Sequence, residues 1–290
     1  MDLNTVVTIT PARERADLRV LGDTVAPLAG GSELFADPRA HLTGLVDLQA
    51  FGWPALTITA DGLDIAATCT LAQLAALPAG PGWAAHPLLF ECCTALYGSF
   101  KVWNVATVGG NLATALPAGP MTSLAAALDA EVLIWRHDGS DERVPAADFV
   151  TGNMTTVLRT GDVLRAIHIP GASLRARTAF RKIALSPIGR SGAVVIGRLD
   201  RDDRFTLTVT AATVRPVHLR YRTLPTAAEL RSGIEGIDAW FTDAHGAADW
   251  RAAVSGVLAE EIRQQLGHPE ATPDPDPSPS PSPSGSEARP

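Results

Sequence analysis

The sequence predicts an α+β protein that is divided into three successive units. Short apolar stretches with the period of strands alternate with helix-like stretches over most of the 290 residues. Two Gly-Gly turns, at residues 30–31 and 109–110, each follow an apolar stretch. A Pro-Gly pair at residues 170–171 separates a mixed region from one in which three predicted strands precede two predicted helices.

The first predicted unit, residues 1–54, is a small βαβ-type arrangement. Strands are expected over residues 6–9, 26–29 and 45–48, and a helix is expected from Pro11 to Leu21. The second unit, residues 55–172, is expected to mix both element types. Its predicted strands cover residues 56–59, 63–66, 130–134 and 162–169, and its predicted helices cover residues 71–77 and 87–97.

The third predicted unit, residues 173–267, is a three-stranded antiparallel sheet with helices. Its strands are expected at residues 175–183, 194–199 and 205–212, and its helices at residues 226–234 and 247–266. Residues 268–290 are dominated by proline and serine. Because such a segment has little apolar surface to offset the entropy of ordering, it is predicted to be a disordered tail.

Composition excludes several classes of function. Hydrophobic residues make up 46% of the chain and charged residues 19%, and no apolar run reaches the roughly 18 residues that a membrane span needs. The net charge of -7 and the scattered arginines argue against a nucleic-acid partner. The first residues lack the basic cluster and apolar run of a signal peptide, so a cytoplasmic location is expected.

The sequence also lacks the residue patterns of metal and nucleophile sites. Its three cysteines, Cys69, Cys92 and Cys93, cannot supply the four thiolates of a zinc or iron-sulfur site, and they are expected to be buried thiols. The seven histidines have no metal-ligand spacing. No Walker loop, Rossmann fingerprint, nucleophile elbow or zinc-protease motif occurs.

The two glycine turns are the candidate binding site. The first is Ala29-Gly30-Gly31-Ser32-Glu33, and the second is Thr107-Val108-Gly109-Gly110-Asn111. Glycines let the backbone approach a ligand closely, so consecutive N–H groups in each turn could converge on a phosphate, and Ser32 could cap a following helix. The side chains of Thr107 and Asn111 could add hydrogen bonds. The alternative is that each turn is only a tight strand-to-helix connection.

These residues resemble the FAD-binding subunit of the molybdenum hydroxylases, the family of the carbon monoxide dehydrogenase medium subunit and the xanthine dehydrogenase flavin domain. Residues 27–34 resemble the family's first FAD loop, and residues 104–112 resemble its second, which is the most specific match. Further family segments are resembled, in the same order, by residues 45–48, 63–74, 124–132, 149–152, 158–162, 167–170 and 243–251. The resemblance covers residues 1–267.

The resemblance implies both a fold and a role. The fold is a two-part FAD-binding domain of the PCMH (vanillyl-alcohol-oxidase-like) type, followed by the C-terminal unit. The cofactor is FAD, and the implied contacts include Leu28 before the first loop, Leu164 in a later strand and Lys182 near the ring. The implied partners are a two-cluster [2Fe-2S] subunit and a large molybdenum-cofactor subunit, in a heterotrimer where electrons pass from the clusters through FAD to an acceptor.

Several positions depart from the family pattern. Residues 116–120 replace a segment that commonly supplies a serine and an aspartate to the flavin, Trp103 replaces an arginine, and Phe180 stands where a ring-side tyrosine is common. Lys182, at a strand edge, either reaches the cofactor or is only solvated. These changes leave a second interpretation open, in which the chain is a scaffold subunit with the same partners but without electron transfer. A self-contained flavin oxidase is disfavoured because no acid-base constellation is identified.

Overall fold

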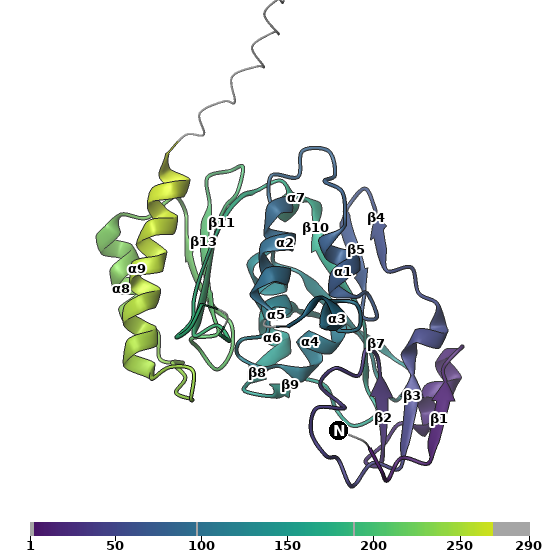
Figure 1. The fold of residues 1–290 in the computed structure, drawn as a ribbon. Coiled ribbons are helices and arrows are strands. Elements are labelled where there is room, and N and C mark those ends of the chain that lie inside the picture. Colours follow the sequence, from purple (N-terminus) through teal and green to yellow (C-terminus); the bar gives the residue numbers. More distant parts are fainter. Residues whose placement is uncertain (1–2, 97, 188, 269–290) are drawn as a thin grey trace, which may run out of the picture.

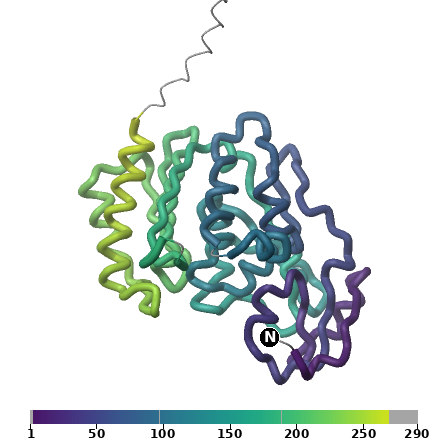
Figure 2. Tube along the Cα trace, in the orientation of Figure 1, coloured from purple at the N-terminus to yellow at the C-terminus, as the bar shows by residue number. Residues whose placement is uncertain are grey.

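The computed structural model describes residues 3–96, 98–187 and 189–268. Within these residues three larger sheets follow one another along the chain, and helices accompany each of them (Figure 1). The chain trace places the first sheet and the last helices at opposite ends of the molecule, with the middle sheet between them (Figure 2). This arrangement confirms the predicted α+β class. The expected limits of the three units remain predictions, and the expected disordered tail, apart from His268, falls on residues outside those described.

The N-terminal sheet has three short parallel strands. Its order is β1 (Thr8–Pro11), β3 (Gly44–Asp47) and β2 (Val25–Leu28). The helix expected after Pro11 is a six-residue 3-10 helix, η1 (Arg15–Val20), and a second one, η2 (Leu48–Phe51), follows β3. Leu18 and Val46 belong to a small core that packs on Val163 of the middle sheet.

The middle sheet is antiparallel throughout, and helices pack on it. Its strand order is β4 (Leu56–Ile58), β5 (Gly62–Ala66), β10 (Val163–Pro170), β6 (Glu131–Trp135) and β7 (Asp141–Pro145). Its helices are α1 (Leu71–Ala75), α2 (His86–Ala95), α3 (Phe100–Trp103), α4 (Val108–Thr114), α5 (Pro120–Ala127), α6 (Ala146–Phe149) and α7 (Gly171–Leu174). A two-stranded ribbon, β8 (Val150–Gly152) and β9 (Thr155–Thr156), lies beside α6.

Every residue of α5 is buried. Pro120 occupies its first turn, where a missing N–H costs nothing, and the rest of the helix is small or apolar except for Thr122 and Ser123. Such a helix must be covered on all sides. It contacts α2, α4 and α6 within the middle unit and strands β12 and β13 of the C-terminal sheet.

The C-terminal sheet is a four-stranded antiparallel meander: β11 (Arg177–Ile183), β12 (Ala193–Leu199), β13 (Phe205–Thr210) and β14 (Val217–Tyr221). The predicted number of three strands is therefore wrong by one, because β14 was missed. Helices α8 (Ala227–Glu235) and α9 (Ala248–Gly267) cover one face, and α5 lies against the other (Figure 1). Alternation along β12 explains the two faces: Val195 joins the core with α9, while Val194 and Ile196 join the core of the middle unit.

Candidate functional site

The first glycine loop leaves a row of backbone donors without partners. After β2 ends at Leu28, the chain passes through two overlapping turns, in which the Phe35 N–H bonds the Gly31 carbonyl at 2.9 Å and the Ala36 N–H bonds the Glu33 carbonyl at 3.0 Å. No α-helix begins here, so the expectation that Ser32 caps one is wrong. Within the described chain, no acceptor lies in hydrogen-bond range of the N–H groups of residues 30–34. Five consecutive amides are thus available to a ligand.

Both glycines of this loop are required by their surroundings. A Cβ on Gly30 would lie 1.6 Å from the carbonyl oxygen of Val105, so the loop touches the backbone just before α4. Gly31 has a φ of 71°, a left-handed conformation that favours glycine. The loop therefore lies against the backbone that leads into the second glycine segment.

The second glycine segment is the first turn of helix α4 and not a loop. Thr107 is its N-cap, and its hydroxyl accepts the Gly110 N–H at 3.0 Å. The N–H groups of Val108 and Gly109 donate to the carbonyls of Cys69 and Ala67 at 2.8 and 3.0 Å, and the Asn111 N–H donates to the Thr107 carbonyl at 2.9 Å. The expectation that backbone donors of this segment converge on a phosphate is therefore wrong, because all four have partners within the chain.

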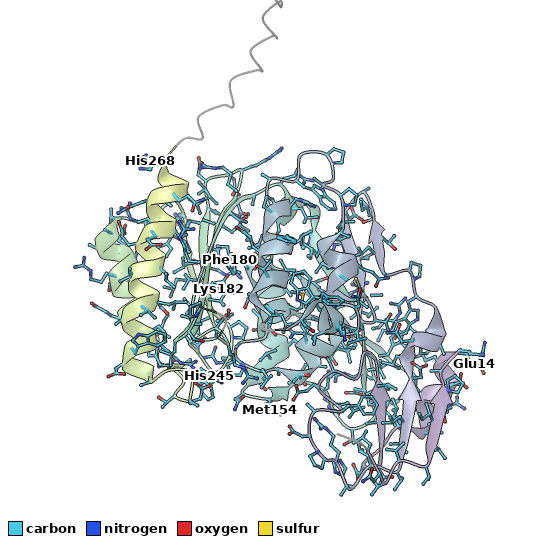
Figure 3. The ribbon with its side chains drawn as sticks, viewed as in Figure 1. Glu14, Met154, Phe180, Lys182, His245 and His268 are labelled. Carbon is cyan, nitrogen blue, oxygen red and sulfur yellow. The ribbon has the colours of Figure 1, made fainter. Side chains whose placement is uncertain are left out.

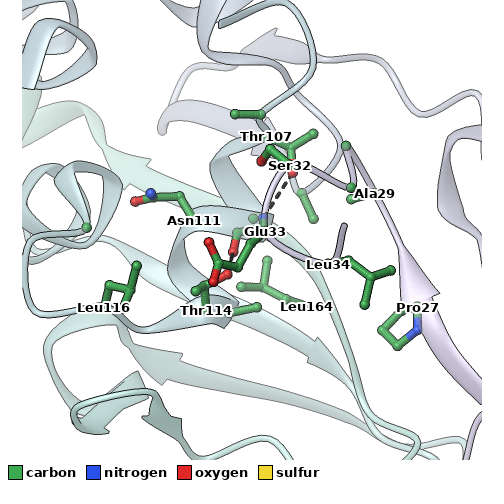
Figure 4. A pocket seen from close by; sticks show the side chains of 18 of the residues that line it. Pro27, Ala29, Ser32, Glu33, Leu34, Thr107, Asn111, Thr114, Leu116 and Leu164 are labelled. Atoms are coloured by element: carbon green, nitrogen blue, oxygen red, sulfur yellow. Dashed lines mark hydrogen bonds between the residues drawn. The ribbon is translucent and has the colours of Figure 1, made fainter. Parts of the chain in front are cut away.

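Side-chain donors of α4 remain free for a ligand. The Thr107 hydroxyl is used only as an acceptor, so its hydrogen is available. The Asn111 Oδ1 accepts the Met121 N–H at 2.9 Å, and no acceptor among the described residues faces the Asn111 Nδ2. Figure 4 shows both side chains beside Ser32 and Glu33 of the first loop.

The loop and α4 together form one wall of a cleft of about 650 Å³. A cleft of this size is within the range of small-molecule and cofactor sites. Most of the sequence-predicted site residues line it: Leu28, Ala29, Gly30, Gly31, Ser32, Glu33, Thr107, Gly109, Gly110, Asn111 and Leu164. Val108 does not line it, because its side chain is buried in the core. Contact of any of these residues with a cofactor remains a prediction.

Lys182 lies outside the residues that line the cleft. It is exposed on β11, and its Nζ lies 3.4 Å from the carbonyl oxygen of Thr94 at the end of α2. Figure 3 shows Lys182 and Phe180 on the strand of the C-terminal sheet that faces α2. The cation from this unit that does line the cleft is Arg190.

Charged side chains are few along the cleft: Glu33, Arg39, Asp162 and Arg190. Asp162 is occupied, because its carboxylate accepts from Arg136 at 2.6 Å and from the backbone N–H groups of Arg159 and His137. Burial alone would raise the pKa of Asp162, but these hydrogen bonds lower it below its usual value. Asp162 therefore stays ionised and structural.

Sequence reasoning missed Arg39 and Arg190 as cleft residues. Neither belongs to a glycine turn, and both are brought to the cleft by tertiary packing. A basic residue after a glycine loop is the one signal that could have marked Arg39.

The segment that departs from the family pattern forms an apolar wall. Leu116 and Ala118 line the cleft, and Pro120 is buried at the start of α5. Met154, placed by its N–H bond to the Ala115 carbonyl at 2.8 Å, also lines it. This part of the cleft can exclude water but offers no side-chain hydrogen bonds.

The three cysteines are free and buried, as expected. Burial raises the pKa of Cys69 and of Cys93 to about 12, and that of Cys92 well above its usual value. They are protonated thiols that pack in the core. Within the described ranges there is no cluster of three metal-ligating side chains, and no helix is both long and apolar enough to span a bilayer.

A family model matches this chain over more than half its length. Residues 7–172 match the model described as the FAD binding domain in molybdopterin dehydrogenase. The glyceraldehyde dehydrogenase medium chain of Sulfolobus acidocaldarius is 33% identical over 95 residues, which is 33% of this chain and 33% of the relative. The aligned segment thus spans about a third of that relative's length.

Solved structures share the fold over almost the whole chain. Carbon monoxide dehydrogenase from Oligotropha carboxidovorans aligns with a TM-score of 0.78 and 22% identity, covering 91% of this chain and 98% of that chain. Quinoline 2-oxidoreductase from Pseudomonas putida 86 aligns with a TM-score of 0.74 and 20% identity, again covering 91% and 98%. These matches extend the fold through the C-terminal unit, which the family model does not cover.

Proposed function

Because the chain belongs to the FAD-binding domain family of the molybdopterin dehydrogenases, we propose that it is the FAD-binding electron-transfer subunit of a molybdenum hydroxylase-type dehydrogenase. The observation that carries the proposal is the row of five unpartnered N–H groups, residues 30–34, at the wall of the cleft. Such a row is what a phosphate group needs from a protein backbone. A cytoplasmic location is part of the same proposal.

The residues present fit an FAD molecule. Because Gly30 has no side chain, the loop backbone can pack against Val105 at the cleft wall, where a ligand can reach its N–H groups. The Nε of Arg39 is buried and lacks a hydrogen-bond partner, which suits a cleft that is completed by a ligand. Residues from the first, middle and C-terminal units all line the cleft, so it can hold an extended dinucleotide.

Each wall has a distinct task in this proposal. The first-loop amides bind the pyrophosphate, and the Thr107 hydroxyl and the Asn111 amide donate further hydrogen bonds. Leu116, Ala118 and Leu164 exclude water from the cofactor. Ala29, Gly30 and Gly31 allow the first loop to turn, and Gly109 and Gly110 allow α4 to pack closely at the cleft. Lys182 lies outside the cleft lining, and in this proposal it stabilises the end of α2 through its contact with the Thr94 carbonyl.

Bound FAD would supply the redox chemistry, since an isoalloxazine ring can accept and release electrons. Among the described residues that line the cleft there is no histidine, and of its two carboxylates that of Asp162 already accepts three hydrogen bonds. We therefore assign the chain a relay role and place substrate oxidation in another subunit.

The proposed partners are a two-cluster [2Fe-2S] subunit and a molybdenum-cofactor subunit. Three buried cysteines cannot ligate a [2Fe-2S] cluster, which takes four thiolates, so the clusters of such a complex belong to another chain. One relative is named as a medium chain, which supports a multi-subunit assembly.

A visible absorption spectrum tests the proposal. The purified full chain, after incubation with FAD and gel filtration, is expected to retain flavin absorption, and dithionite is expected to bleach it. A chain that retains no flavin would contradict the proposal and favour the scaffold interpretation. Turnover of a small-molecule substrate by the isolated chain would contradict the relay assignment instead.

A further inference from the structure

One buried donor in the cleft has no role in the glycine-loop pattern. Arg39 lies in the segment that joins β2 to β3, five residues after the row of free amides, and it lines the same cleft. Its Nε is buried without a hydrogen-bond partner. Within the described residues its guanidinium also forms no ion pair and stacks on no aromatic ring.

Two other arginines with a buried Nε, Arg198 and Arg177, have acceptors within the chain for their guanidinium groups. The Arg198 guanidinium pairs with Asp129 at 2.5 Å and with Asp200 at 2.8 Å. The Arg177 Nη2 donates to the His268 carbonyl at 3.0 Å. Among these arginines Arg39 therefore stands apart as a permanently charged group that has no acceptor in the part of the chain that the structure describes.

The missing acceptor must come from what fills the cleft. Of the two carboxylates along the cleft, that of Asp162 is occupied by Arg136, and that of Glu33 forms no hydrogen bond or ion pair within the described chain. Peptide N–H groups can bind phosphate oxygens but carry no net charge, and the amides at the start of α4 are already used. A pyrophosphate in this cleft would thus lack a cationic partner unless an arginine supplies one.

We propose that Arg39 donates a charge-assisted hydrogen bond to the pyrophosphate of the bound dinucleotide, and so strengthens its binding. This inference rests on the proposed function. It assigns charge neutralisation to the loop between β2 and β3, while the glycine-loop amides fix the position of the phosphates.

The test compares FAD affinity among variants of the full-length, flavin-free chain by fluorescence titration. Arg39→Ala is expected to weaken FAD binding by about 10- to 100-fold, the range for loss of a hydrogen bond to a charged group. Arg39→Lys keeps the charge but not the Nε donor, and it is expected to recover part of the loss. Arg19→Ala is the matched control, since Arg19 is an exposed arginine of the same unit outside the cleft.

Phosphorus NMR of the saturated proteins identifies the contact. The pyrophosphate resonances of bound FAD are expected to shift in Arg39→Ala and to be unchanged in Arg19→Ala. Weakened FAD binding with unchanged phosphorus resonances would overturn the inference, because Arg39 would then act elsewhere on the ligand. Equal FAD affinity in the wild type and Arg39→Ala would overturn it as well.

Two controls separate the possible failures. The thermal unfolding of the flavin-free Arg39→Ala chain is expected to match the wild type, because its Nε has no protein partner to lose. If that variant does not fold, the phosphorus resonances of FAD bound to Arg39→Lys are compared with those of the wild type. A shift supports the inference, and identical resonances overturn it. A wild type that binds no FAD would defeat the proposed function itself, whereas a wild type that binds FAD as tightly as Arg39→Ala defeats only the inference.

Discussion

Two adjacent glycines in α4 face different neighbours. A Cβ on Gly109 would lie 2.5–2.7 Å from the Cβ, Cα and carbonyl oxygen of Ala67, which are rigid parts of the middle unit. A Cβ on Gly110 would meet only the Thr107 hydroxyl, at 2.8 Å, and Gly110 lines the cleft. Gly109 therefore serves packing, and Gly110 keeps the cleft open.

This difference predicts two separate defects. Gly109→Ala should lower the free energy of unfolding by about 1–3 kcal/mol, because the helix must move away from Ala67. Gly110→Val should change stability less but weaken FAD binding at least 10-fold, because its side chain would enter the cleft. Urea unfolding and FAD titration of both variants check this. A Gly110→Val chain that binds FAD as the wild type does would place the cofactor elsewhere.

At the residue scale, the sequence could predict which glycines matter but not what each one does. The role of Gly109 depends on Ala67, which approaches only in the folded chain. For the same reason the backbone donors of residues 108–111 could not be counted as used, since two of their acceptors, Cys69 and Ala67, are distant in sequence. The glycine turn of the first loop could be predicted from local sequence, but the contact of Gly30 with Val105 and the lack of acceptors for the loop amides are found only in the folded chain.

At the element scale, the C-terminal end of α5 is held by the C-terminal sheet. The Arg198 Nη1 donates to the Ala127 carbonyl at 2.8 Å, and the His218 Nε2 lies 3.1 Å from the Ala126 carbonyl. The contact from Arg198 satisfies a carbonyl at the helix end for which no backbone partner is found among the described residues, whereas the Ala126 carbonyl also accepts the Asp129 N–H at 3.1 Å. Arg198 and Arg220 both pair with Asp129, directly after the helix. β14 thus positions His218 and Arg220 for α5.

His218 should make stability depend on pH. Burial, and then the nearby Arg220 charge, lower the pKa of His218 from 6.5 to about 4. The folded state therefore binds a proton less readily than the unfolded state. The stabilisation is complete above pH 6.5 and is lost as the pH falls towards 4, by about 2 kcal/mol between pH 7 and pH 5.

The measurement is urea unfolding of the wild type and His218→Gln at several pH values. Glutamine can still donate to the Ala126 carbonyl but does not titrate in this range. The difference in unfolding free energy between the two chains should shrink as the pH falls from 7 to 5. A difference that is constant over this range would contradict the lowered pKa.

Elements buried on both faces were the easiest to predict. Apart from Arg198, strands β12 and β13 are apolar, small or threonine on both sides, and their predicted limits are close to those observed. β14 was missed although its apolar residues alternate with His218 and Arg220, as in a strand with one polar face, and the end of α5 explains these polar residues. Short helices such as α4 and α6 were missed because one or two turns carry too little periodicity.

At the scale of the whole molecule, α5 joins the cofactor cleft to the C-terminal unit. Gly119, which precedes α5, lines the cleft, and the helix packs against β12 and β13. The Ala211 N–H donates to the Pro117 carbonyl at 2.8 Å, and the Ser123 and Thr210 hydroxyls lie 2.6 Å apart in a buried position. The middle and C-terminal units are therefore expected to unfold together.

A double-mutant cycle on Ser123 and Thr210 tests this connection. Removal of one hydroxyl leaves the other without its closest partner, so Ser123→Ala and Thr210→Val should each lower the free energy of unfolding by about 1–3 kcal/mol. The double variant should lose about 1 kcal/mol less than the sum of the two, because no orphaned hydroxyl remains. Each chain should still unfold in a single transition by both circular dichroism and tryptophan fluorescence. Additive losses, or two separated transitions, would show that α5 does not couple the cleft to the C-terminal sheet.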